Sequence, residues 1–178
     1  GHVESEIASI RKKGKKVVVI SSEHGFDPLK LARISKANAL DPKSILGGVY
    51  VSRAFNMFQA EKLISKLGPE TATSLGAPLL VVMDLHVLFS DDGDSIENIR
   101  RFGHCISELK RRSLTLKCEF VFKSILDDGA SSLVDEASLQ ADELAIFDRP
   151  GKRCLVGRTS PLPLSSNPPS REALGSTD

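Results

Sequence analysis

Residues 17–37, VVVISSEHGFDPLKLARISKA, decide the fold class of this 178-residue chain. The run VVVI at 17–20 is apolar on both alternating faces, which predicts a strand covered on both sides, as in a parallel sheet. Asp27 and Pro28 form a helix-start signal, because an N-cap residue is followed by proline at the first helical position. The stretch therefore predicts a strand that passes directly into a helix.

The rest of the chain continues this alternation. Predicted strands lie at 49–55, 78–85 and 118–126, predicted helices at 3–13, 59–67 and 96–113, a short helical piece after Asp41-Pro42, and two strands around the turn 148–151. The segment GPETATSLGAP at 68–78 is predicted to be a loop, and 78–85 is the most apolar segment, which predicts the centre of the sheet. This order predicts an α/β domain with a mainly parallel sheet, whose functional residues gather at the carboxyl ends of the strands. Residues 1–163 are expected to form one domain, and the Pro- and Ser-rich segment 164–178 a flexible tail.

Composition excludes several classes of protein. The chain has 24 Lys and Arg against 23 Asp and Glu and is 40% hydrophobic, which excludes wholesale disorder and any whole-protein attraction to nucleic acid. No apolar run approaches the roughly 20 residues of a membrane-spanning helix, so no membrane partner is expected. Three cysteines without a C-x-x-C pair (Cys105, Cys118 and Cys154) predict buried thiols and a cytoplasmic location, or a nuclear one in a eukaryote.

Two carboxylates fall where such a sheet places its ligands. Glu23 follows the strand at 17–20, and Asp84 ends the apolar run PLLVVMD. An apolar strand that ends in an acidic residue is typical of a carboxylate that helps to hold Mg²⁺, although a turn or cap residue is the commoner role of such an aspartate. His24 and His86 flank the two carboxylates. A metal cluster of these four side chains is the less favoured interpretation, and ordinary polar residues at strand ends the favoured one.

Residues 20–56, ISSEHGFDPLKLARISKANALDPKSILGGVYVSRAFN, resemble the RecA/RadA-type recombinase ATPases. That family has an apolar strand, Asp-Thr-Glu, a Phe-x-Pro helix start, Leu-Asp-Pro and Val-Tyr-x-Ala-Arg-Ala-Phe-Asn in the same order. The resemblance extends more loosely through PLLVVMDLHVLF to the final hairpin and its Ser-Pro end, and covers residues 16 to about 163.

The resemblance implies a RecA-like fold and a role for each matching residue. Glu23 matches the glutamate that polarises the attacking water, and Asp84 matches the Walker B aspartate, which contacts Mg²⁺ through water. Pro161 and Pro163 lie where the family packs a segment against the neighbouring subunit's nucleotide, and Arg153 and Arg158 are further candidates there. The implied cofactor is Mg-ATP at a subunit interface.

Departures from the family pattern predict lost catalysis. The sequence contains no Gly-x-x-x-x-Gly-Lys-(Ser/Thr) run, so nothing in it supplies the phosphate-binding nest of backbone N–H groups. Ser21 replaces the aspartate of Asp-Thr-Glu, and Lys123-Ser124 replaces the Asn-Gln pair. The two positions of the family's DNA-contacting loops hold the acidic stretches SDDGDS and DDGASSLVDEAS, which repel a phosphate backbone.

Three functions follow as hypotheses. The leading one is a non-catalytic or weakly catalytic partner or regulator in DNA repair or recombination, bound to recombinase-like ATPase subunits or to itself. The first alternative is a Mg-dependent nucleotide hydrolase whose phosphate loop lies outside this sequence. The second is a DNA-binding module that uses the basic helix at 96–113, through Arg100, Arg101, Arg111 and Arg112, for which a solvated helix face is the competing interpretation. Phe55, Met57 and Phe58 are expected to pack in the core rather than to form an exposed knob.

Overall fold

The computed structural model describes residues 2–90, 95–116, 118–127, 139, 141–149 and 152–159. Within them, six strands form one sheet in the order β2-β1-β3-β4-β6-β5. The strands are β1 (Val17–Ser21), β2 (Val49–Arg53), β3 (Leu79–Met83), β4 (Glu119–Asp127), β5 (Glu143–Arg149) and β6 (Lys152–Thr159). Strands β2, β1, β3 and β4 are parallel, and the hairpin β5–β6 joins β4 in antiparallel pairing. The mainly parallel sheet, the final hairpin and the interior position of β3 are confirmed.

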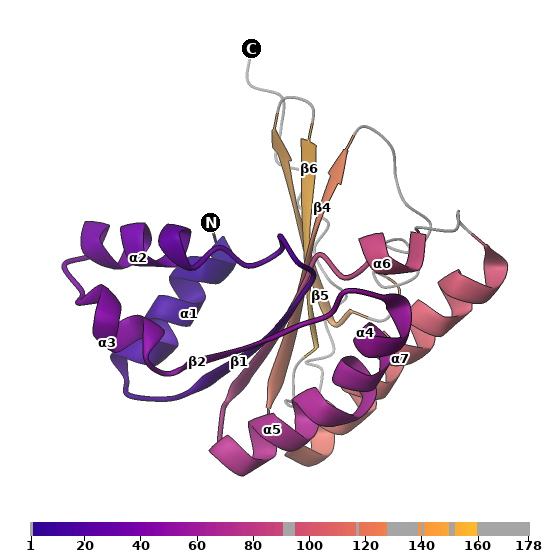
Figure 1. The fold of residues 1–178 in the computed structure, drawn as a ribbon, viewed down its shortest axis with the longest axis horizontal. Helices are drawn as coiled ribbons and strands as arrows, with labels where there is room; N and C mark the ends of the chain where they lie inside the picture. The colour runs from indigo at the N-terminus through magenta and orange to yellow at the C-terminus, as the bar shows by residue number, and fades with distance from the viewer. Residues whose placement is uncertain are drawn as a thin grey trace.

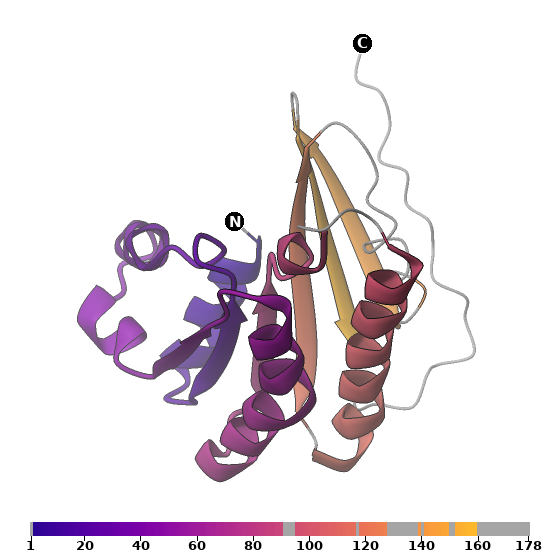
Figure 2. The ribbon, with the colours of Figure 1, turned by 45° about the vertical axis from the view of Figure 1, so that its right-hand side comes forward.

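Helices cover the sheet on two sides. They are α1 (His2–Lys12), α2 (Pro28–Ala37), α3 (Pro42–Leu46), α4 (Met57–Lys62), the π-helical turn η1 (Leu63–Leu67), α5 (Gly68–Leu75), α6 (Val87–Ser90) and α7 (Ile96–Leu116). Figure 1 shows α1, α2 and α3 on one side of the sheet and α4, α5 and α7 on the other, and Figure 2 shows the same layers after a turn of 45°. This is the three-layer α/β architecture that the alternating pattern predicts.

The helix-start signals act as the sequence indicates. The Asp27 carboxylate accepts a hydrogen bond from the backbone N–H of Leu29 at 2.8 Å, and Pro28 opens α2. The Asp41 carboxylate accepts from the N–H groups of Lys43 and Ser44, at 3.3 and 2.9 Å, to start α3. Each side chain satisfies backbone donors that have no partner within the helix, so both helices begin where local chemistry allows.

The loop predicted at 68–78 is wrong. Residues 68–75 form α5, which continues the helical path of α4 and η1 and ends at Gly76, a left-handed C-cap with φ of +61°. The sequence does not indicate this helix clearly, because Gly68 and Pro69 are residue types typical of turns. Here Pro69 lies in the first helical turn, and Gly68 lies so close to the sheet that a Cβ there would be 2.4 Å from Ile20 Cδ1. Packing against β1 therefore overrides the local turn preference.

Alternate residues of β1 enter different cores. Val18 and Ile20 pack with side chains of α5 and α7, whereas Val17 and Val19 pack with α1 and α2. All five residues of β1 are buried, as are all five of β3. The central strands are thus covered on both faces, which explains their continuous apolar runs.

The predicted core packing of Phe55, Met57 and Phe58 is wrong for two of these three residues. Met57 is partly buried against the core, but the side chains of Phe55 and Phe58 are 61% and 67% exposed. The thiols of Cys105 and Cys118 are buried, as predicted, and Cys154 is partly buried. The predicted tail at 164–178 and the prolines Pro161 and Pro163 lie outside the described residues.

Candidate functional site at the carboxyl edge of the sheet

The structure places Glu23 and Asp84 at the same edge of the sheet. Strands β1 and β3 are parallel neighbours with Ser21 opposite Met83; Glu23 lies two residues beyond Ser21, and Asp84 lies one residue beyond Met83. The Ser22 N–H donates to the Met83 carbonyl at 3.1 Å, and the Asp84 N–H donates to the Lys123 carbonyl at 2.8 Å. The carboxyl ends of β1 and β3 are therefore joined to each other and to the middle of β4 where the two acidic residues leave the sheet.

The two acidic side chains differ in their surroundings. Glu23 has a side chain that is 65% exposed, with His24 Nε2 3.9 Å from its carboxylate. Asp84 is half-buried and has a φ of +54°, a left-handed conformation that aspartate tolerates better than most residues. Glu23 thus faces solvent, while Asp84 is fixed in the turn that ends β3.

Arg53, at the end of β2, holds the turn that carries Glu23. Its guanidinium donates to the backbone carbonyl of Glu23 and, at 3.3 Å, to that of Phe26. Phe26 is itself buried in the core under α1 and α2. Arg53 is not among the site residues predicted from the sequence, although its position in the closely matching stretch 20–56 was an available signal.

A buried ion pair lies beneath this edge. Lys123 of β4 is opposite Met83, and its Nζ atom is 3.0 Å from Glu4 Oε1, with both side chains less than 10% exposed. Lys30 of α2 contacts the same carboxylate oxygen at 2.8 Å. Burial by itself raises the pKa of Glu4, but the hydrogen bond from Lys30 and the charge of Lys123 outweigh it, and the pKa falls to about 2.

Lys123 therefore has a partner within the fold. From the sequence, Lys123 is predicted only to replace an asparagine of the family, and Glu4 has no predicted role. A lone lysine inside the apolar strand CEFVFKSIL was the available signal, because a charge buried in a sheet needs a counter-charge.

The candidate arginines of α7 are mostly paired with acids. Arg101 lies 3.3 Å from Glu61 and 3.2 Å from Glu97. Arg111 and Arg112 share Glu108, at 2.5 and 3.5 Å. Arg100 is exposed and makes no ion pair with a described residue. Three of the four arginines predicted to bind nucleic acid are thus already paired with carboxylates at the helix surface.

The remaining residues predicted to lie at a subunit interface are Arg153, Arg158, Pro161 and Pro163. Arg158 of β6 bridges to Glu6 of α1 at 2.7 Å and also contacts Glu119, so it joins the hairpin to α1 and β4. Of Arg153 only the backbone, in β6, is described, and Pro161 and Pro163 are outside the described residues.

Nowhere in the described ranges do three or more His, Cys, Asp or Glu side chains form a group suited to a metal ion.

The carboxyl edge suits a cation better than a triphosphate. The carboxylate oxygens of Asp84 and Glu23 are the ligand type that Mg²⁺ prefers. A triphosphate needs several N–H groups and a free cation. Two cations near this edge are already engaged, Lys123 with Glu4 at 3.0 Å and Arg53 with the carbonyls of Glu23 and Phe26. The described residues alone therefore do not fit Mg-ATP.

A mainly parallel sheet between two helical layers, with acidic residues after adjacent central strands, is the arrangement of a RecA-like α/β domain. A sequence model of the Rad51 family matches residues 7–120, and the chain belongs to that family. No individually curated protein matches it. Membership makes this a recombinase-like protein related to recombination and repair.

No helix in the described part of the chain is long and apolar enough to span a membrane.

Proposed function

We propose that this Rad51-family domain acts in DNA repair or recombination as a non-hydrolysing partner or regulator. It docks on a recombinase-type ATPase subunit or on a second copy of itself, in the cytoplasm or in the nucleus of a eukaryotic cell. The observation that carries the proposal is the exposed apolar surface formed by β2 and the start of α4. We call it the β2 surface, and its residues are Tyr50, Val51, Phe55 and Phe58.

Strand β2 lacks the cover that its neighbours have. It pairs with β1 on one side and is one of the two edge strands of the described sheet. Four of its five residues are exposed, which includes side chains on both faces of the sheet. Parallel strands are normally covered on both faces, and an exposed edge presents backbone N–H and C=O groups to another chain. The strand is therefore suited to pair with a segment of a partner.

The two phenylalanines are held outward by the start of α4. The Asn56 side chain accepts a hydrogen bond from the Gln59 N–H at 2.9 Å, and the Gln59 side chain accepts one from the Phe55 N–H at 2.9 Å. This reciprocal arrangement is similar to a capping box and fixes the chain on both sides of Asn56. Because the backbone is already ordered, a partner that covers the rings meets little additional entropic cost.

The ion pair at the carboxyl edge supports a non-hydrolysing role. Lys123 and Glu4 neutralise each other within the fold, so the lysine is not available to balance a phosphate charge. Arg53, a second cation at this edge, is likewise engaged within the fold, because its guanidinium donates to the backbone carbonyls of Glu23 and Phe26. These contacts favour docking over catalysis by this chain.

The test replaces one ring of the β2 surface, Phe58. Phe58→Ser is expected to weaken association with a recombinase-type ATPase from the same organism, or self-association, by about 2 kcal/mol or more, roughly 30-fold in Kd. Leu29→Ser is the matched control, because Leu29 is equally exposed on α2, away from the β2 surface. Cross-linking and sedimentation measure the two kinds of association. Two results would falsify the docking proposal. One is an equal loss of association in the Phe58 and Leu29 variants, and the other is a parent chain that associates neither with the ATPase nor with itself.

A second function, Mg-dependent nucleotide hydrolysis, is favoured by the shared edge position of Glu23 and Asp84. In that case the phosphate loop is supplied by a segment outside this sequence. Calorimetry with Mg-ATP separates the two functions. Heat that disappears in Asp84→Asn, with hydrolysis lost in Glu23→Gln, supports the hydrolase, whereas absence of heat at millimolar nucleotide removes it for this chain.

A further inference from the structure

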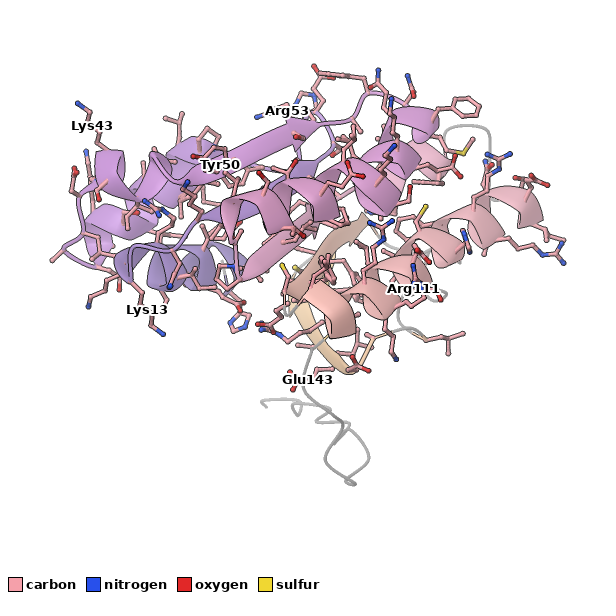
Figure 3. The ribbon with its side chains drawn as sticks, turned by 90° about the horizontal axis from the view of Figure 1, so that it is seen from below. Lys13, Lys43, Tyr50, Arg53, Arg111 and Glu143 are labelled. Atoms are coloured by element: carbon pink, nitrogen blue, oxygen red, sulfur yellow. The ribbon has the colours of Figure 1, made fainter. Side chains whose placement is uncertain are left out.

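Positive charge is concentrated in one half of the molecule. Residues 11–53 hold ten Lys and Arg against three Asp and Glu, although the whole chain has a formal net charge of only +1. These residues form the end of α1, the strands β1 and β2, and helices α2 and α3. Figure 3, seen from below, shows Lys13, Lys43 and Tyr50 in this half, while Arg111 and Glu143 lie in the other.

Within this half, positively charged side chains are most closely spaced in the turn between α1 and β1. Lys12, Lys13, Lys15 and Lys16 are all exposed, and none forms an ion pair with a described residue. The turn enters the amino end of β1, so it lies at the edge of the sheet opposite to Glu23 and Asp84. Four positive charges within five residues repel one another, and a polyanion would relieve that repulsion.

Arg11 fixes this turn against α3. Its guanidinium donates to the carbonyls of Ile45, Ser44 and Lys15, at 2.9, 2.9 and 2.6 Å. The fit is close, because a Cβ on Gly48 would lie 2.0 Å from the guanidinium carbon of Arg11. The basic turn and α3, which carries the exposed Lys43, are therefore one ordered surface.

Tyr50 of β2 belongs to the same surface. Lys16 Nζ lies 5.8 Å from the centre of its ring, and the tyrosine is 40% exposed. The nearest acidic residue in sequence is Asp41, whose carboxylate is occupied by the backbone N–H groups of Lys43 and Ser44. The surface therefore combines unpaired ammonium groups with one aromatic ring.

We infer that this amino-edge surface (Lys12, Lys13, Lys15, Lys16, Lys43 and Tyr50) binds the phosphate backbone of DNA. Contacts from lysine ammonium groups position a duplex without reading its sequence, and the released counterions drive the binding. The turn RKKGKK offers no apolar side chain to enter a bilayer, which disfavours a membrane. The choice of DNA over other polyanions rests on the proposed role in recombination. The surface shares Tyr50 with the β2 surface but includes neither Phe55 nor Phe58.

The first test is the salt dependence of binding to a fluorescent DNA duplex. Four phosphate contacts predict a slope of about −3.6 in log K against log salt, or about 100-fold weaker binding at 200 mM than at 50 mM. Lys13→Ala with Lys15→Ala is expected to reduce the magnitude of the slope by about 2 and the affinity about tenfold at low salt. Lys62→Ala with Lys66→Ala is the matched control, because both lysines are exposed on α4 and η1. This control should stay within twofold of the parent.

The second test locates the bound DNA. Tyr50 is the only tyrosine in the chain and there is no tryptophan, so incorporated 3-fluorotyrosine gives one ¹⁹F resonance from this surface. We expect that resonance to shift or broaden on titration with duplex at low salt, and to respond less in the Lys13/Lys15 double variant.

Four outcomes overturn the inference. The first is that the parent chain does not bind the duplex at 50 mM salt, and the second is that the Lys13/Lys15 and Lys62/Lys66 variants lose equal affinity. The third is that affinity is lost in Arg100→Ala with Arg111→Ala and not in the Lys13/Lys15 variant. The fourth is that the chain binds anionic vesicles or heparin more strongly than DNA. The Lys13/Lys15 variant should keep the partner association of the parent chain. A failed DNA test with intact, Phe58-dependent association leaves the proposed function standing, and the converse result leaves the DNA surface standing.

Discussion

Glu4 and Lys123 are separated by 119 residues in sequence, yet their charged atoms lie 3.0 Å apart in the interior. The pair joins α1 to the middle of β4, where Lys123 is opposite Met83, the last residue of β3 before Asp84. A charge pair removed from water is retained only if each partner stays matched, because either charge alone is costly to bury. The local stability of the candidate site therefore depends on this contact.

Removal of one partner should destabilise the protein strongly. Glu4→Gln leaves the Lys123 ammonium buried beside a neutral amide, and we expect a loss of about 3 to 5 kcal/mol in the free energy of unfolding. Urea denaturation measures the change. The control is Glu97→Gln, which removes only an exposed partner of Arg101 and should cost less than about 1 kcal/mol. Recovery of most of the stability in Glu4→Leu with Lys123→Met is expected, and a Glu4→Gln loss no larger than the control's would contradict the structural role.

Stability should also fall in acid because of the same carboxylate. The pKa of Glu4 is about 2 in the folded protein against 4.5 for the free side chain, so the unfolded chain takes up its proton first as the pH falls. The contribution of Glu4, about 3 kcal/mol, is complete above pH 4.5 and is lost as the pH falls towards 2. Unfolding curves measured across this range should be steeper in pH for the parent chain than for Glu4→Gln. Identical pH profiles would show that Glu4 does not titrate in this way.

Arg53 should control the mobility of the turn that carries Glu23. Arg53→Ala removes the donors to the Glu23 and Phe26 carbonyls. We expect faster hydrogen–deuterium exchange in a peptide covering 22–27, with a change in global stability of about 1 kcal/mol or less. A control variant, Arg100→Ala, should leave that peptide unchanged. Unaltered exchange in the Arg53 variant would remove its assigned role.

The cysteines should differ in reactivity. Burial raises the pKa of both the Cys105 and the Cys118 thiols to about 12, so almost no thiolate is present at pH 8. Alkylation by iodoacetamide, followed by mass spectrometry, should modify the partly buried Cys154 first and the other two only in denaturant. Early labelling of Cys118 in the folded protein would contradict its position under the sheet.

Gly68 should tolerate no side chain. A Cβ at this position would lie 2.4 Å from Ile20 Cδ1 and 2.7 Å from the Leu63 carbonyl. Gly68→Ala is therefore expected to cost about 1 to 3 kcal/mol, despite the better helix propensity of alanine. Thermal unfolding provides the measurement. A stabilised variant would mean that α5 can move away from β1.

Much of the fold could be predicted because its determinants are local. The apolar run at 17–20, the Asp-Pro starts at 27–28 and 41–42, and the final hairpin depend on neighbours within a few residues. Parallel order then places Glu23 and Asp84 at one edge, because adjacent parallel strands end on the same side. The resemblance over residues 20–56 indicated the family that the match over 7–120 confirms.

Tertiary structure decided what local patterns do not encode. Gly68 and Pro69 form a helix start only because β1 lies against them, and Phe55 and Phe58 are exposed because no described element covers that end of β2. Glu4, Lys30 and Lys123 are far apart in sequence, and only the packing of α1 against α2 and against the sheet brings their charges together. Sequence periodicity specifies which face of an element is apolar, whereas the identity of the opposing side chain depends on the completed packing of the sheet and its helices.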